Sequence, residues 1–245
     1  MTAALRYFAQ LEELLATVMD REIHAIREAA GKIAHALMNG GRLHLFGTGH
    51  SHMIAEELFY RAGGLANVNP IFLEGLMLHA NALQSTELER LPGLARIVFD
   101  QQQTCEGDVL IIASNSGRNA VNIEMALIAR ERGLHVVALT SLKHSASATS
   151  RHSSGKLLYQ VCDTVIDNHG IIGDASIAVD GFPRRVAPTS TAIGAAIVNA
   201  IVAETVELMV KGGSMPEVFA SSNADGGDSI NQSLVHKYRG VIRAL

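Results

Sequence analysis

The fold of this chain is constrained most strongly by an apolar run followed directly by a polar turn. Residues 108–113 read Asp-Val-Leu-Ile-Ile-Ala, and residues 114–119 read Ser-Asn-Ser-Gly-Arg-Asn. A strand this apolar is buried on both faces, which is typical of the central strands of parallel sheets. A helical pattern over 120–131 and another apolar strand over 135–140 complete a strand–helix–strand unit. The sequence therefore predicts an α/β protein.

The same alternation extends to both sides of this unit. Further strands are expected at 42–46, 67–73 and 163–167, and a helix is expected from about Ser51 to Arg61 or Ala62. Segment 74–103 is mostly helical in pattern, with a break at Pro92-Gly93. Strands alternating with helices predict a three-layer α/β/α sandwich. Right-handed crossovers then place every strand-to-helix turn along one edge of the sheet.

The two ends of the chain are expected to pack on this core as parts of a single domain, residues 1–245. Residues 1–39 are amphipathic and form either two helices or one bent helix. The α/β core covers 40–211, and a tail with a short helix over 232–245 covers 212–245. Within the core, 174–186 is expected to be an extended excursion or hairpin. The apolar stretch 191–210 is expected to be a buried helix.

Composition narrows the class of protein. Hydrophobic residues make up 48% of the chain, charged residues 18%, and the formal net charge is −4. No basic run suggests a nucleic-acid surface. The apolar stretch 191–210 contains Asn199, Glu204 and Glu207, which are costly in a bilayer. We therefore expect a cytoplasmic protein that binds neither nucleic acid nor membrane. In that compartment Cys105 and Cys162 are expected to be separate thiols, and a disulfide between them is the less favoured alternative.

Three predicted strand-to-helix turns carry hydroxyl groups. They contain Ser51, the stretch 114–117, and 189–191 (Thr-Ser-Thr). A helix N-terminus offers unpaired N–H groups and the positive end of the helix dipole, which favour an anion. Each turn alone could be an ordinary helix cap. Three on one edge, one of them with two hydroxyls, an amide and a glycine, indicate a phosphate site.

Three other known motifs are matched only in part by this sequence. Residues 47–52 have His52 where a dinucleotide-binding fingerprint needs its third glycine. Met53 replaces the closing glycine of a nucleophile elbow. Residues 223–228 resemble the start of a calcium loop, but no Glu closes it. His50, His52 and His79 show no metal-ligand spacing. No cofactor and no metal are expected.

The sequence resembles the sugar isomerase (SIS) domain family. The matching stretches are 43–51, 108–119 with its helix, and the helix start at 188–191. Residues 218–227 and the chain as a whole are similar to a subgroup of bacterial proteins known only as sugar isomerase domain proteins. The resemblance implies a five-stranded parallel sheet that binds phosphosugars.

The resemblance also implies a set of ligand-binding residues on these turns. The phosphate would lie among Ser51, Ser114, Ser116 and Thr189 or Ser190. The glycines let the backbone approach the ligand, and His50 lies next to Ser51. The candidate binding residues are Gly49, His50, Ser51, Ser114, Asn115, Ser116, Gly117, Asn119, Thr189 and Ser190.

Aldose–ketose isomerisation requires a base that moves a proton between two carbons, and Glu and His are the natural candidates. Glu74 and His79 follow the second strand, as acidic and His residues do in related isomerases. Glu57, with Glu56 beside it, lies on the helix where the heptose isomerase branch carries a catalytic Glu. His236 could enter a neighbouring subunit's site, as a C-terminal His does in that branch.

The leading hypothesis is an isomerase acting on a sugar phosphate or amino-sugar phosphate. A lyase or etherase on the same scaffold is an alternative, and a non-catalytic phosphosugar sensor is another. The apolar faces of the N-terminal helices and of the 191–210 helix favour subunit packing. We expect a homodimer or homotetramer whose site is completed across subunits.

Overall fold

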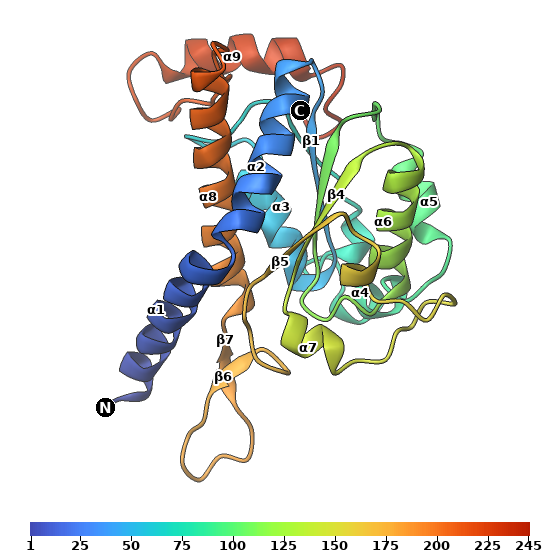
Figure 1. Ribbon diagram of the computed structural model, residues 1–245, viewed down its shortest axis with the longest axis vertical. Helices are drawn as coiled ribbons and strands as arrows, with labels where there is room; N and C mark the ends of the chain where they lie inside the picture. The colour runs from blue at the N-terminus through green and yellow to red at the C-terminus, as the bar shows by residue number, and fades with distance from the viewer.

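A fully parallel five-stranded sheet forms the centre of the molecule (Figure 1). The computed structural model describes all 245 residues. The strand order is β2-β1-β3-β4-β5, which places the most apolar strand, β3, in the middle. The strands are β1 (Leu43–Gly47), β2 (Val68–Pro70), β3 (Val109–Ala113), β4 (His135–Thr140) and β5 (Thr164–Asp167).

Helices cover both faces of the sheet. Val109 and Ile111 of β3 point into a core shared with α2, α3 and α8. Leu110 and Ile112 point into a second core shared with α5 and α6. The three-layer α/β/α sandwich is thereby confirmed. The α-helices are α1 (Ala3–Arg21), α2 (Ile23–Met38), α3 (His52–Leu58), α4 (Ala82–Leu88), α5 (Leu94–Phe99), α6 (Ala120–Glu131), α7 (Leu142–Ala146), α8 (Ser190–Lys211) and α9 (Gly227–Tyr238), and the 3-10 helices are η1 (Gly49–Ser51), η2 (Glu74–Leu76) and η3 (Leu158–Gln160).

The N-terminal segment is two helices separated at Glu22, which is one of the two arrangements that the sequence allowed. Several other boundaries differ from the sequence-based expectation. The second strand covers only Val68–Pro70, and the helix after β1 ends at Leu58. The last helix, α9, starts and ends earlier than 232–245, and Gly226, in a left-handed conformation, caps its N-terminus. Both cysteines are free, and burial raises the pKa of Cys162 to about 12.

α8 is the one helix long and apolar enough to cross a membrane by length and composition. In the structure it packs along α2 and α3 and contributes Ile193, Ile197 and Ile201 to the larger core. The chain therefore uses this helix as a core helix, as expected. Its polar side chain Asn199 donates to Glu57 Oε1 at 2.7 Å.

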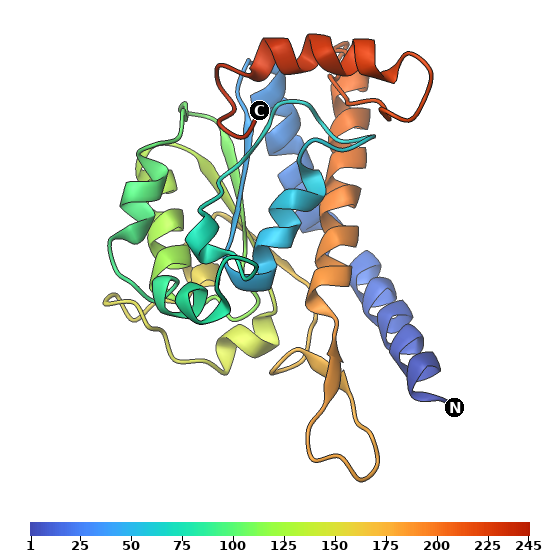
Figure 2. The same ribbon diagram turned by 180° about the vertical axis from the view of Figure 1, so that it is seen from behind.

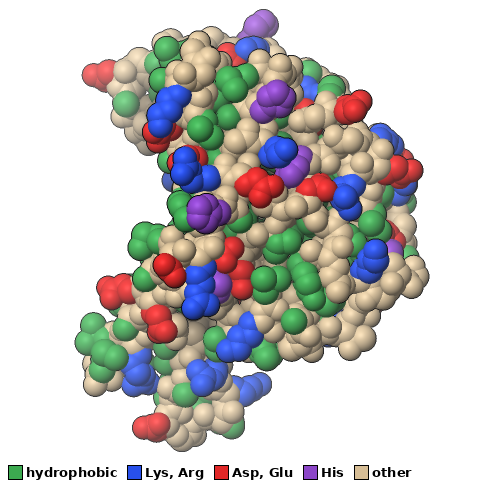
Figure 3. Space-filling view, viewed as in Figure 1, with side chains coloured by type: hydrophobic (Ala, Val, Ile, Leu, Met, Phe, Trp, Pro, Cys, Tyr) green, Lys and Arg blue, Asp and Glu red, His purple; other side chains and the backbone are tan.

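α1 and a two-stranded antiparallel hairpin project from the body (Figures 1 and 2). The hairpin strands are β6 (Ala175–Ile177) and β7 (Val186–Pro188), which confirms the expected hairpin. The Tyr7 hydroxyl donates to Pro188 O at 2.8 Å, which ties α1 to the hairpin. The projecting part carries exposed hydrophobic side chains, visible among charged ones in Figure 3. Phe8 and Phe182 are two of them.

A buried polar network crosses the amino edge of the sheet. Asp108 Oδ2 lies 2.9 Å from His44 Nε2, and both side chains are fully buried. The same carboxylate accepts the N–H groups of Arg42 and Cys105 at 2.8 Å each. Asn69 reaches His44 Nδ1 from β2 at 2.9 Å. One side chain, Asp108, therefore links the beginnings of β1 and β3.

Ionised Asp108 is favoured by this network. Burial is the largest influence and opposes the charge, but the hydrogen bonds from His44 and from the N–H groups of Cys105 and Arg42 outweigh it and lower the pKa of Asp108. A lowered folded-state pKa gives stability that is present above the ordinary pKa of 3.8 and is lost as the pH falls through the folded-state value.

We predict that Asp108→Asn lowers the free energy of unfolding by about 3 kcal/mol at pH 7, because buried donors lose their charged acceptor. Urea unfolding at pH 7 and at acid pH measures this, and the difference from wild type should shrink below the ordinary Asp pKa. Asp100→Asn, which breaks the exposed pair with Arg132, is the control and should cost less than about 1 kcal/mol. Equal losses in the two variants would contradict the role given to Asp108.

Candidate functional site

The three hydroxyl-bearing turns meet at one cavity on the carboxyl edge of the sheet. The cavity has a volume of about 20 Å³, opens to solvent, and lies between the turns after β1 and β3 and the start of α8. This is the juxtaposition that parallel topology predicts. Its lining residues are Ser51, Ile54, Ala113, Ser114, Asn115, Leu139, Asn168, Ser190, Thr191 and Gly194.

In the turn after β3, three carbonyl groups are occupied and the N–H groups of the same three peptides are free, whereas the Gly117 N–H donates to Ser114 Oγ at 3.3 Å. The carbonyls of Asn115, Gly117 and Arg118 accept backbone N–H groups of the β4–β5 connection at 3.2, 2.8 and 2.8 Å. Ser116 makes no hydrogen bond through its N–H or its hydroxyl. Because the N–H and C=O of a peptide point in opposite directions, holding the carbonyls toward that connection turns the amides away from it. The turn thus presents unpaired donors at the N-terminus of α6.

Gly117 is required at this turn. Its φ is +57°, a left-handed conformation, which glycine adopts without steric cost. A Cβ there would lie 3.0 Å from Ser145 Oγ and 3.1 Å from Leu158 Cβ. The close packing of the β4–β5 connection on the turn therefore depends on the missing side chain.

The turn after β1 is equally tight. A Cβ on Gly47 would collide with the carbonyl of Ser51, so this position needs glycine. Gly49 is left-handed, with φ +57°. The Ser51 N–H donates to Thr48 O at 3.1 Å, whereas the Ser51 hydroxyl is unpaired beside the cavity. His50 is exposed next to it.

The start of α8 differs, because a carboxylate of the chain itself already binds it. Asp174 Oδ1 accepts the N–H groups of Thr189 and Ser190 at 3.1 and 3.0 Å. Asp174 Oδ2 accepts the Ser190 hydroxyl at 2.5 Å. The donors that the sequence assigned to an incoming phosphate therefore hold Asp174, while Thr191 lines the cavity.

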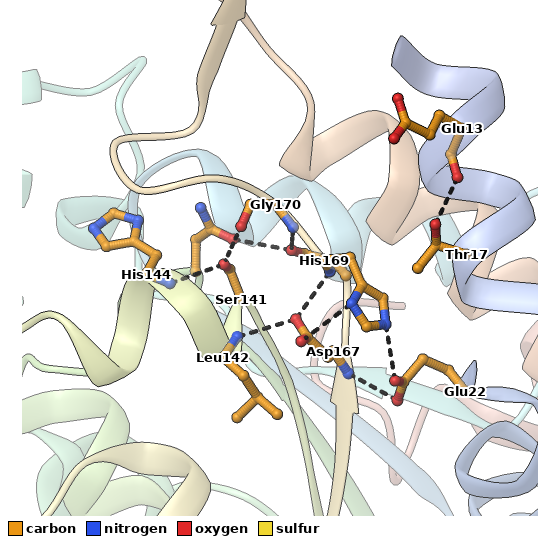
Figure 4. Close-up of polar contacts among 11 residues, drawn as sticks. Glu13, Thr17, Glu22, Ser141, Leu142, His144, Asp167, His169 and Gly170 are labelled. Atoms are coloured by element: carbon orange, nitrogen blue, oxygen red, sulfur yellow. Dashed lines mark hydrogen bonds and ion pairs between the residues drawn. The ribbon is translucent and has the colours of Figure 1, made fainter. Parts of the chain in front are cut away.

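The segment after β5 supplies the wall opposite the β1 turn. Asn168 lines the cavity and donates through its amide to Asn115 Oδ1 at 2.9 Å. Asn168 Oδ1 accepts the Gly170 N–H at 2.9 Å, and Ser141 Oγ donates to Gly170 O at 2.6 Å (Figure 4). The Asn115 Nδ2 atom is buried without a partner. An amide donor is thus available at the cavity.

Two carboxylates and a histidine anchor this segment to the N-terminal helices (Figure 4). His169 Nε2 lies 2.9 Å from Glu22 Oε1, at the junction of α1 and α2. His169 Nδ1 lies 3.4 Å from Asp167 Oδ2. Asp167 Oδ1 accepts the N–H groups of Leu142 and His169 at 3.0 and 2.9 Å. Since Asn168 lies between Asp167 and His169, these contacts set its position.

The predicted acid–base residues lie outside the cavity lining. The Glu57 carboxylate pairs with Arg61 and accepts from Asn199 of α8. Glu74 and His79 are exposed on the segment after β2, and the His79 ring lies 5.9 Å from that of His52. No group of three His, Cys, Asp or Glu side chains could hold a metal ion.

Sequence reasoning missed three polar residues at this edge. Asn168 directly follows β5, so the rule that ligands bind where parallel strands end could have found it. Asp174 precedes α8 by sixteen residues, and only the folded hairpin brings them together. Glu89, from the end of α4, accepts the Thr48 hydroxyl at 2.9 Å, and Thr48 in turn accepts from Asn122 at 3.2 Å. The sequence neighbours of Asp174 and Glu89 give no such signal.

Fold and turns together define an open parallel α/β protein with a polar cavity at its strand-to-helix turns. The chain belongs to the SIS domain family, whose sequence model matches residues 6–141. It is similar to a UPF0309 protein of Geobacillus thermodenitrificans, with 46% identity over 98% of this chain and 96% of the relative.

Solved structures share the fold at low sequence identity. A phosphoheptose isomerase from Neisseria gonorrhoeae is similar with a TM-score of 0.54 and 18% identity, over 85% of this chain and 97% of that one. The Vibrio vulnificus NanR protein in complex with ManNAc-6P is similar with a TM-score of 0.53 and 14% identity, over 98% of this chain and 70% of that one.

We predict that Asp174→Ala lowers the free energy of unfolding by about 1–2 kcal/mol, because the first turn of α8 loses its carboxylate acceptor. Thermal or urea unfolding measures the change. Asp180→Ala, at the exposed tip of the same hairpin, should change stability by less than about 0.5 kcal/mol. If Asp174→Ala were as stable as this control, the capping role would be wrong.

Proposed function

We propose that the protein binds a sugar phosphate in the cavity, with the phosphate on the turn after β3. The observation that carries the proposal is a set of free donors on this turn: the Ser116 hydroxyl and the N–H groups of Ser116, Arg118 and Asn119, whose peptide carbonyls are held by the β4–β5 connection. An anion at a helix N-terminus completes such donors. Membership of the SIS domain family and the likeness in fold to a phosphoheptose isomerase support the same ligand class.

The ligand-binding residues follow from this placement. Ser51, Ser114 and Asn115 line the cavity, and Ser116 to Asn119 lie directly before α6. Thr189 and Ser190 would contact the ligand only when Asp174 leaves their donors. The proposed set remains Gly49, His50, Ser51, Ser114, Asn115, Ser116, Gly117, Asn119, Thr189 and Ser190.

For the reaction, we propose aldose–ketose isomerisation in a site completed by a second subunit. The reaction needs a base, and no titratable side chain lines the cavity within one chain. Glu74 and His79 are exposed on the same edge of the sheet, where a second copy in a cytoplasmic homodimer or homotetramer could cover them. His236 of a second copy is a further candidate, since it lines an open hollow with Tyr60 on the surface.

A non-catalytic phosphosugar sensor is the second candidate. The absence of an acid or base from the cavity lining favours it, and the fold is also that of NanR, solved with ManNAc-6P. A lyase or etherase needs a carboxylate as acid and base. Like the isomerase, it would therefore need a titratable group from outside the cavity lining of one chain.

We predict that Ser116→Ala weakens sugar phosphate binding by about 1 kcal/mol or more, because a hydroxyl donor to a charged oxygen is lost. Isothermal titration calorimetry with a panel of hexose and amino-hexose phosphates measures the change. Ser233→Ala, on the exposed face of α9, is the matched control and should bind as the wild type does. Binding that is unaffected by Ser116→Ala would refute the placement of the phosphate.

We predict that NMR detects aldose–ketose exchange of one panel member, and that Glu74→Gln abolishes the exchange while binding persists. Removing the proton acceptor blocks proton transfer but leaves the phosphate contacts in place. Tight binding of one sugar phosphate without turnover of any would favour the sensor. Full activity of Glu74→Gln would remove Glu74 as the base.

A further inference from the structure

The β4–β5 connection is rich in hydroxyls and basic groups and contains no acid. Residues 141–162 include Lys143, Arg151 and Lys156, six serines and one threonine, but no Asp or Glu. This connection lies against the turn after β3, since its N–H groups at Ser141, Arg151 and Leu158 bind the turn's carbonyls. A carboxylate-free, basic segment therefore borders the phosphate site proposed above.

Two arginines are fixed where the connection meets the turn. Arg151 donates through Nη1 to Asn119 Oδ1 at 2.8 Å. Arg118 donates through Nε to Thr149 O at 2.9 Å. The backbone N–H of Arg151 donates to Arg118 O at 2.8 Å, so the two residues are direct neighbours. Each guanidinium is anchored through one nitrogen and keeps its other N–H groups free.

Neither guanidinium has a carboxylate partner. The ion pairs of the structure use Arg27, Arg61, Arg96, Arg130 and Arg132, with two lysines and four histidines, and omit Arg118 and Arg151. Burial, followed by the positive charges of Arg118 and Arg90, lowers the pKa of Arg151, while Glu89 acts in the opposite direction. Glu89 itself accepts the Thr48 hydroxyl. Positive charge thus accumulates at Arg118 and Arg151, where Glu89 acts on Arg151 but forms no ion pair with either arginine.

We infer that Arg118 and Arg151 form a second anion subsite, so that the ligand is a sugar phosphate with a second anionic group. The inference rests on the proposed function, because the hydroxyls and amides of the turn after β3 are assigned to the first phosphate. The forked, permanently charged guanidinium suits a carboxylate or a second phosphate with two parallel hydrogen bonds. A carboxylate and a phosphate both offer negatively charged oxygen atoms that can accept these hydrogen bonds.

The start of α8, which also borders the cavity, gives the ligand a direction. Asp174 places a carboxylate at the start of α8, next to the lining residue Ser190. A negative charge there disfavours an anion, while Arg118 and Arg151 favour one at the start of α6. The two anionic groups of the ligand therefore lie toward α6, and the neutral hydroxyl groups of the sugar lie toward α8.

The test compares ligands that differ in the second charge. Calorimetry of the full-length protein uses inorganic phosphate, glucose 6-phosphate, 6-phosphogluconate and fructose 1,6-bisphosphate, at low and physiological salt. We expect 6-phosphogluconate or fructose 1,6-bisphosphate to bind at least about tenfold more tightly than glucose 6-phosphate, as charge-assisted hydrogen bonds would give. Whichever of the two binds more tightly identifies the second group as carboxylate or phosphate.

Variants show which residues cause the preference for doubly anionic ligands. The double variant R118Q/R151Q should lose the tenfold preference but keep its affinity for glucose 6-phosphate, which also shows that it is folded. R118K/R151K should restore part of the preference, because the charge is kept and the fork is lost. Arg184→Gln, at the exposed hairpin tip without a carboxylate partner, is the control and should bind as the wild type does.

Three results overturn the inference, and they are distinguishable. Equal affinity for glucose 6-phosphate and both doubly anionic ligands removes the second subsite and leaves the proposed function intact. If none of the ligands binds, both the second subsite and the proposed function are refuted. A preference that survives in R118Q/R151Q also overturns the assignment to these arginines.

Discussion

The orientation of three peptide groups, those with the carbonyls of Asn115, Gly117 and Arg118, is the constraint on which the site depends. Their carbonyls are held by the β4–β5 connection, and their amides consequently face the other way. The buried strand β3 fixes where this turn begins, and Gly117 lets the connection pack closely enough to reach it. Hydrogen bonds within the scaffold thus determine where donors are left unpaired, and side chains such as Ser116 only add to them.

The sequence predicted the sheet and its turns because both depend on local patterns. The apolar run at 108–113 predicts a central strand, and parallel topology brings Ser51, Ser114 and Ser190 to one cavity. Contacts between distant segments were not predictable. The capping of α8 by Asp174 requires the hairpin to fold back, and the hydrogen bond from Asn199 to Glu57 requires α3 to pack on α8.

Charge is distributed unequally around the cavity. Asp174 occupies the helix end at α8, whereas the helix end at α6 has free donors flanked by Arg118 and Arg151. Two helix N-termini that look alike in sequence are therefore electrostatically different in the fold. A hydroxyl-rich turn indicates a phosphate site only when no carboxylate of the chain itself binds there first.

The excursion between β5 and α8 leaves the cavity wall at Asn168 and returns to it at Ser190. Its two ends are pinned separately, by Asp167 and His169 at one end and by Asp174 at the other. Residues 178–186 between them are, without exception, exposed. The tip can therefore tolerate insertions and deletions without reshaping the cavity. It is the natural place to graft a reporter group or an affinity tag, and it is free to diverge among relatives while the cavity stays the same.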